Sequence, residues 1–388
     1  MLQGWSTTVV ISAKSVCPNQ KLYASLEENM ENSGQLFKGV VAATVVIGLS
    51  LFACISVPPD LLMGWGTLFL VAMVPAQMVV SLLWRCEYPR AIADLPQPWR
   101  GLGFFALSAL LAVMVGYVSW QTVGGGISPP TPFVNMYLIF TVPVALWLII
   151  PLQAWPLNLV CKSIGWLGGS LLVVTYTLAY LLFRVFFNFN FLNGAPFYQA
   201  VLDPSGLYMA WIPLAMSIAS VAVILILVLL DFWPVVVLAK FFPALTKQPI
   251  FAIANGLLIA VAVFLLWWFF VGYGGMDLVL FQTKVCVALI FGLFIVLVML
   301  EGLPGLKVAQ PWRGLFLTGI ACVLAVVMFE LYRVVVLGRF ALPGGEPPYA
   351  LELWLASSML AVTFPAMVAH ANYLQFWPLG LRKSGSNQ

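Results

Sequence analysis

Residues 97–101 read Gln-Pro-Trp-Arg-Gly, and residues 310–314 repeat the same five letters. Related versions occur at residues 35–39 (Gln-Leu-Phe-Lys-Gly), 248–252 (Gln-Pro-Ile-Phe-Ala) and 161–165 (Cys-Lys-Ser-Ile-Gly). Each copy opens a unit that closes on an X-Pro step, where the residue before proline disfavours helical geometry. These steps lie at residues 88–89, 155–156, 233–234, 303–304 and 377–378. Five repeated units are therefore expected, and a repeat of this kind decides the fold before any single residue does.

The composition indicates a membrane protein. The chain is 63% hydrophobic and 8% charged, whereas about a quarter of the residues of a soluble domain are charged. Apolar runs near or above the roughly 20 residues that cross a bilayer as helix occupy residues 39–57, 62–84, 101–121, 133–153, 165–187, 207–230, 250–271, 278–300, 314–337 and 350–370. The runs show no alternation of apolar and polar residues, which argues against a β-barrel. We predict an all-α integral membrane protein with about ten transmembrane helices, arranged as five repeated helical hairpins.

The same pattern predicts one membrane domain flanked by two tails. Residues 1–36 are expected to form a cytoplasmic N-terminal tail, and residues 381–388 a cytoplasmic C-terminal tail. The polytopic membrane domain covers residues 37–380, with hairpin repeats at about 37–96, 97–160, 161–247, 248–309 and 310–380. The outward loops are too short to hold a separate catalytic domain.

Basic residues predict the orientation. The side shared by both termini carries Lys14, Lys21, Lys38, Arg85, Arg90, Arg100, Lys162, Lys240, Lys247, Lys307, Arg313, Arg382 and Lys383, whereas Arg339 lies in an opposite loop. The positive-inside rule therefore predicts a multi-pass protein of the plasma (inner) membrane with both termini in the cytoplasm. Membrane lipids are the expected partners of this charge, and no basic run with interleaved aromatic residues suggests nucleic acid.

The five units all enter the membrane in the same direction, so a pseudo-symmetry axis along the membrane normal can relate them. A closed ring is the simpler arrangement, and a split at the long third unit is the alternative. Glycines concentrate on the odd-numbered helices, for example at Gly101, Gly168 and Gly314. Because small residues let helices approach closely in lipid, this pattern predicts that the odd-numbered helices form the inner set.

Prolines mark the even-numbered helices. Pro75, Pro143 and Pro365 each lie 13 or 14 residues before the closing X-Pro step, and Pro213 is the off-register counterpart in the third unit. All four are expected to kink their helices and free backbone carbonyls, which could widen a cavity at mid-membrane. The alternative is that proline is simply common in membrane helices.

Five ionisable residues form the candidate substrate site. All of them fall in the outward third of the expected spans: Arg184, Lys284, Glu330, Arg333 and Glu352. A charged side chain at that depth is costly unless it pairs with another group or serves the function. Glu330 and Arg333 are three residues apart and could pair on one helix face. The remaining positive charge predicts an outward vestibule that attracts anions. The alternative is that these side chains snorkel to the interface and pair structurally.

No cofactor or metal site is expected. His370 is the one histidine and the six cysteines are scattered, which excludes a haem held by two histidines of this chain. We find no Ser-His-Asp set and no paired carboxylates at catalytic spacing, so an integral membrane enzyme is the weakest hypothesis. The sequence favours a transporter or channel for a small anionic or amphipathic solute. The alternative is a non-catalytic, lipid-binding anchor or scaffold subunit, with partner subunits or as a homo-oligomer.

Overall fold

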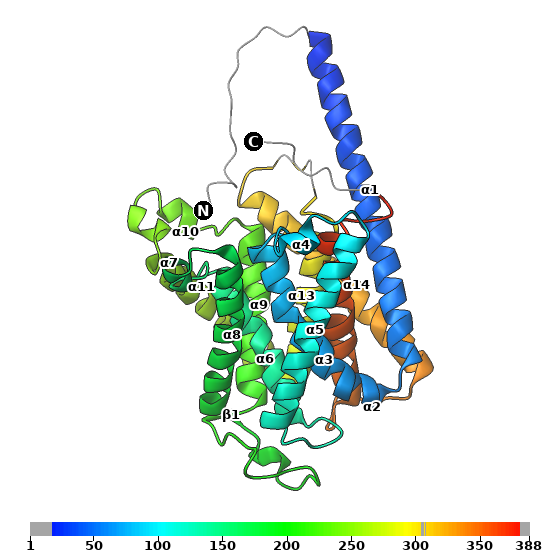
Figure 1. Cartoon of the computed structure of the whole chain (residues 1–388), viewed down its shortest axis with the longest axis vertical. Helices are drawn as coiled ribbons and strands as arrows, with labels where there is room; N and C mark the ends of the chain where they lie inside the picture. The colour runs from blue at the N-terminus through cyan, green and yellow to red at the C-terminus, as the bar shows by residue number, and fades with distance from the viewer. Residues whose placement is uncertain (1–17, 304–305, 307, 381–388) are drawn as a thin grey trace.

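The protein, seen in a computed structural model, is a bundle of long helices (Figure 1). The structure describes residues 18–303, 306 and 308–380, and for residues 18–33 it describes the backbone alone. Ten helices of this part of the chain are long and apolar enough to cross a membrane. The prediction of a multi-pass, predominantly helical membrane protein is therefore confirmed. The first helix, α1 (Pro18–Ser56), begins within the predicted tail and continues unbroken into the first span, Gly34–Ser56.

The odd-numbered spans are mostly single α-helices. Span 1 is the end of α1, span 3 is α5 (Trp99–Thr122), span 5 is α8 (Ile164–Phe186), span 7 is α11 (Ile250–Trp267) extended by the π-helix η5 (Trp268–Tyr273), and span 9 is α14 (Trp312–Arg339).

Three of the even-numbered spans alternate between α- and π-helix. Spans 4 and 6 are the α-helices α6 (Pro132–Ile149) and α9 (Trp211–Leu229). Span 2 joins α2 (Pro59–Leu61), η1 (Leu62–Gly66), α3 (Thr67–Met78) and η2 (Val79–Leu83). Span 8 joins α12 (Leu278–Leu280), η6 (Phe281–Val287), α13 (Ala288–Phe294) and η7 (Ile295–Met299). Span 10 joins α15 (Ala350–Ala356), η8 (Ser357–Thr363), α16 (Phe364–Val368) and η9 (Ala369–Tyr373).

The even-numbered spans lie inside. Between 61% and 72% of their apolar windows is buried, against 28% for spans 3, 5, 7 and 9 and 44% for span 1. The prediction that the glycine-rich odd helices form the inner set is therefore wrong. The physical reason is that several of those glycines, including Gly48, Gly169 and Gly319, face outward, since a Cβ added at any of them would meet nothing within 4 Å. We call spans 2, 4, 6, 8 and 10 the inner bundle.

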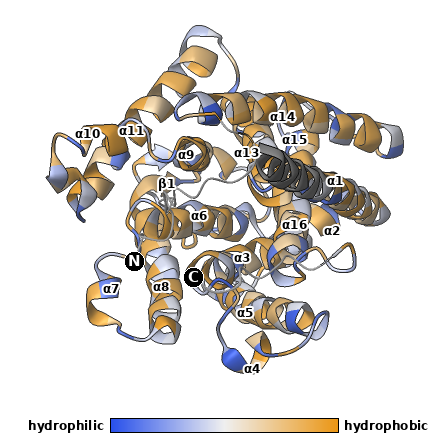
Figure 2. Ribbon diagram, turned by 90° about the horizontal axis from the view of Figure 1, so that it is seen from above, coloured by the Kyte–Doolittle hydropathy of each residue, from blue (hydrophilic) through white to orange (hydrophobic). Residues whose placement is uncertain are grey.

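The inner bundle closes on itself (Figure 2). Span 2 contacts span 4, span 4 contacts span 6, span 6 contacts span 8, span 8 contacts span 10, and span 10 returns to span 2. The outer helices lie against it: α5 against spans 2 and 10, α8 against spans 4 and 2, α14 against spans 8 and 6, and α1 against spans 10 and 8. α11 packs on span 6 and reaches span 4 through Gly256, which lies beside Trp147. Each odd-numbered span from 3 to 9 thus packs chiefly on the even-numbered span before it.

All five inner spans end in a similar way. Two successive residues adopt positive φ at positions 85–86, 153–154, 231–232, 301–302 and 375–376. The second residue of each pair returns its backbone N–H to a carbonyl five or six residues earlier, as in the bond from Phe376 to His370 of 3.1 Å. This left-handed ending closes the helix and satisfies a terminal carbonyl.

The Gln-x-x-Arg-Gly motif joins these helix ends to the outer helices. The Nε2 atoms of Gln97, Gln248 and Gln310 donate to the carbonyls of Tyr373, Pro151 and Leu229, at 2.8, 2.9 and 3.0 Å. These acceptors lie at the ends of spans 10, 4 and 6, whereas the spans that directly precede the three glutamines are 2, 6 and 8. Each glutamine therefore reaches the neighbouring inner span in the closed bundle.

The arginine and glycine of the motif complete the junction. Arg100 donates to the carbonyl of Cys86 at 2.7 Å, at the end of the span just before the motif. Arg313 makes the corresponding bond to Gly302 at 3.3 Å. A Cβ on Gly314 would lie 2.7 Å from the carbonyl oxygen of Leu229. The motif therefore has a structural role, because it ties one outer helix to the ends of two inner spans.

Short elements fill the loops. At the end that we call the α4 end lie α4 (Arg90–Ala93), α7 (Leu157–Val160), α10 (Val235–Leu238) and the 3₁₀ turn η4 (Pro243–Thr246). At the opposite end, the β1 end, β1 (Phe187–Asn188) pairs in parallel with β2 (Tyr208–Met209) around the 3₁₀ turn η3 (Asn190–Leu192). Buried Asp203 holds this loop, since it accepts from the backbone of Phe189 and Ser205 and from the hydroxyl of Tyr198.

Gly314 and Gly319 offer a test of the motif on a single helix. Gly314→Ala should lower the free energy of unfolding by about 1–3 kcal/mol, because the new methyl group meets the backbone of span 6. Gly319→Ala is the matched control: its Cβ meets nothing within 4 Å, and alanine is the better helix former. Thermal unfolding in detergent measures both. Equal unfolding temperatures for the two variants would contradict the role of the motif glycine.

Candidate functional site

The five charged residues proposed from the sequence lie on four spans. Arg184 is in α8, which packs against α6 and η2, whereas Glu330 and Arg333 are in α14, which packs against α13 and α9. Figure 2 shows α8 and α14 on different sides of the inner bundle. Arg184 therefore stands apart from the pair on α14. The side chains of Arg184, Lys284 and Arg333 are all exposed, as is typical of basic residues near an interface.

Glu330 and Arg333 pair directly, with Nε and Oε2 2.8 Å apart. Both side chains are 45% exposed. A pair in this setting contributes little to stability unless it lies in lipid, where each charge needs its partner. The pairing follows from local helix geometry, because residues three apart share a face.

Glu352 is the buried member of the set. It lies in the first turn of α15 and is 5% exposed. Its Oε1 accepts from the backbone N–H of Gly345 at 2.9 Å, which ties the preceding loop to the helix. Its Oε2 is buried without a hydrogen-bond partner. Glu352 therefore has one structural contact and one oxygen available to a donor.

Gln282 supplies a second buried acceptor nearby. It lies in η6, an element that packs against α15, and it is 5% exposed. Its Oε1 also has no partner, as is true of the indole Nε1 of buried Trp354. Trp354 is two residues from Glu352, so the two side chains leave the helix in roughly opposite directions. Glu352 and Gln282 thus lie on two elements that pack together, α15 and η6, and these two residues define the candidate site.

The loop before α15 covers this site at the β1 end. Tyr349 donates from its hydroxyl to Oδ2 of Asp277 at 3.2 Å, and its ring lies 6.4 Å from that of Trp211. Asp277 in turn caps span 8 by accepting from the N–H groups of Val279 and Leu280. Desolvation, together with the carboxylate of Asp277, raises the pKa of Tyr349. The loop is therefore anchored to spans 6, 8 and 10.

The four prolines expected to kink helices occupy different positions. Pro75 and Pro143 lie inside α3 and α6, and Pro365 lies at the junction of η8 with α16. Pro213 is in the first turn of α9, where a backbone N–H has no intrahelical acceptor and proline is accommodated. Pro213 therefore frees no interior carbonyl.

Sequence reasoning missed the polar contacts that join the inner helices to each other and to α14. Gln77 donates to the carbonyl of Pro365 at 3.2 Å, Thr67 to Ser357 at 2.9 Å, and the hydroxyls of Tyr332 and Thr363 are 2.7 Å apart. All of these side chains except that of Ser357 are 5% exposed or less. Such bonds join helices in lipid. The available signal was the placement of Gln, Ser and Thr in otherwise apolar runs.

The described residues hold no group of three or more histidine, cysteine or acidic side chains that could bind a metal ion. His370 lies in η9, half-buried against the ring of Phe376 at 5.8 Å, and its Nε2 has no partner. Chemically, the site at Glu352 and Gln282 offers two oxygens that accept hydrogen bonds. It suits a donor or a cation better than an anion.

Glu352 and Glu330 provide a matched pair of substitutions. Glu352→Ala should lower the free energy of unfolding by about 1–3 kcal/mol, because the N–H of Gly345 loses its acceptor. Glu352→Gln keeps an acceptor and should cost less. Glu330→Ala breaks a half-exposed pair, but the long side chain of Arg333 can extend to the interface, so the cost should be at most about 1 kcal/mol. Thermal unfolding of the three variants checks the order, and a larger loss at Glu330 would overturn the assignment of Glu352.

Comparison with known proteins adds no relative. No protein-family model, curated protein or solved structure matches the chain. Function must therefore be inferred from the geometry of the inner bundle and of its surface.

Proposed function

We propose that this chain is a non-catalytic membrane scaffold, which packs against protein subunits or lipids in the bilayer. The observation that carries the proposal is the close packing of the inner bundle. Residues 71–80 of span 2 and 218–225 of span 6 are buried without interruption. Since a helix turns once every 3.6 residues, every face of these segments is covered. A water-filled channel would expose one face of such helices.

The outer surface supports the same proposal. Large apolar side chains on the odd-numbered spans are widely exposed, for example Val113 at 56%, Phe264 at 58% and Val326 at 65%. In lipid a helix face needs no polarity to associate, so these surfaces can pack against either acyl chains or another membrane protein.

Within this proposal the five sequence repeats are related by rotation around the inner bundle. The support is the recurrence of the left-handed helix endings and of the Gln and Arg contacts at successive inner spans. The protein resides in the plasma (inner) membrane, with the basic α4 end and both termini in the cytoplasm. The support is the positive-inside distribution of the sequence.

A transporter for a small amphipathic solute is the second candidate. The observation that favours it is the pair of free acceptor oxygens on Glu352 and Gln282 within the inner bundle. Buried polar atoms without partners are uncommon in folded proteins and are expected at sites that bind a ligand. The anionic substrate expected from the sequence receives no support from these acceptors.

Two cysteine substitutions test the orientation. Asn193→Cys at the β1 end should react with a membrane-impermeant maleimide in intact cells, whereas Lys162→Cys at the α4 end should react after the membrane is opened. Labelling of the native cysteines in the unsubstituted chain is the control. The reverse pattern would contradict the proposed orientation.

Gentle extraction followed by native mass spectrometry tests the scaffold. We expect a protein partner at fixed stoichiometry, and proteoliposomes of the purified chain should release entrapped small organic acids and amines no faster than empty liposomes. A lone chain that carries a small molecule, and whose flux falls in Glu352→Gln, would replace the scaffold with the transporter.

A further inference from the structure

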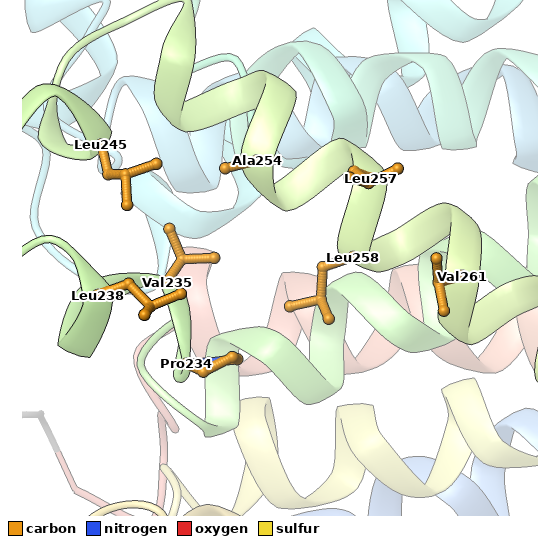
Figure 3. A pocket seen from close by; sticks show the side chains of 8 residues that line it. All are labelled: Pro234, Val235, Leu238, Leu245, Ala254, Leu257, Leu258 and Val261. Carbon is orange, nitrogen blue, oxygen red and sulfur yellow. The ribbon is translucent and has the colours of Figure 1, made fainter. Parts of the chain in front are cut away.

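An apolar groove lies between α10 and α11 at the α4 end (Figure 3). Its volume is about 340 Å³, and it is lined by Pro234, Val235, Leu238, Leu245, Ala254, Leu257, Leu258 and Val261. That volume lies at the lower end of the range of ligand pockets, roughly 300–1,000 Å³. Every lining residue is apolar.

The groove lies beside the short helix α10, at a position where the second unit has a close helix contact. In the second unit, Gly103 lies six residues after the motif glutamine Gln97, and Ile92 of α4 packs so closely there that a Cβ on Gly103 would be 2.8 Å from the Cγ2 of Ile92. The corresponding position in span 7 is Ala254, six residues after Gln248. The methyl group of Ala254 lines the groove, at the position where Gly103 leaves room for Ile92.

The groove faces the bilayer. Leu257 is 68% exposed and Val261 49%, and both lie on α11, an outer helix. Ala254 to Val261 covers about 10 Å along the helix axis, so the groove runs from the helix start toward the acyl region. A peptide in this groove would leave its backbone polar groups without partners, which is costly in lipid. An acyl chain carries no such groups.

Basic residues lie at the loop end of the groove. Lys240 and Lys247 flank η4 in the segment that connects α10 to α11, and both are exposed. This segment contains no acidic residue; Asp231, which precedes α10, accepts a hydrogen bond from Gln310 at 2.7 Å. The lysines are therefore available to a phosphate group at headgroup level.

We propose that this groove binds one acyl chain of an anionic phospholipid, whose phosphate lies against Lys240 and Lys247. The inference stands on the groove and its charges, and it holds whether the chain is a scaffold or a transporter. It assigns the longest loop at the α4 end a lipid-binding role.

Native mass spectrometry of the delipidated protein, titrated with palmitoyl-oleoyl phosphatidylglycerol or phosphatidylcholine, tests the proposal. Leu258→Trp and, independently, Ala254→Phe fill the groove and should weaken binding of both lipids about tenfold. Lys240→Gln with Lys247→Gln should weaken phosphatidylglycerol about tenfold and leave phosphatidylcholine unchanged.

Two control variants separate this site from general lipid adhesion. Val113→Trp changes an exposed apolar residue of span 3, and Lys162→Gln removes an exposed lysine at the same end of the molecule. Both should bind lipid as the unsubstituted protein does. The proposal is overturned if the lysine variant keeps its preference for phosphatidylglycerol, if the controls lose as much binding, or if groove filling displaces a co-purified protein instead of lipid. Size-exclusion chromatography establishes that each variant is folded.

Discussion

The backbone carbonyls at the ends of the inner helices are the groups on which the rest of the structure depends. A helix end leaves carbonyls without intrahelical donors, and five such ends come together at one side of this bundle. Outer helices supply donors: Gln97 to the carbonyl of Tyr373, Gln310 to that of Leu229, and Arg100 to that of Cys86. Because each full copy of the motif, at residues 97–101 and 310–314, reaches the ends of two inner spans, it fixes both the position of an outer helix and the spacing of the inner ones.

The number of spans could be predicted from the sequence, but their placement could not. Ten apolar runs are readable because each must exceed the thickness of the bilayer. Which runs lie inside is not readable in the same way, since lipid is as apolar as the protein interior and gives outer helices no polar face. Gly319 and Gly314 illustrate the difficulty: they lie on one helix, but only Gly314 meets the backbone of a neighbouring span.

The candidate site, too, could be predicted only in part from the sequence. The contact between Glu330 and Arg333 was predictable, because three residues of helix bring them together. The burial of Glu352 and its proximity to span 8 depend on tertiary packing, and in the sequence Glu352 resembles any acidic residue at a helix start. Gln282 gave a weaker signal still, since an amide in an apolar run is equally suited to joining helices and to binding a ligand.

The use of polar side chains inside the bundle bears directly on function. Thr67 with Ser357, Tyr332 with Thr363, and Gln77 with the carbonyl of Pro365 are all engaged between helices. A transport path needs polar groups that face a solute, whereas these side chains bond to one another or to a backbone carbonyl. The free oxygens of Glu352 and Gln282 lie in one sector, under the loop held by Tyr349 and Asp277. Spans 8 and 10 therefore carry the unpartnered carboxylate and amide oxygens of the candidate site, whereas many other polar groups of the bundle hold its helices together.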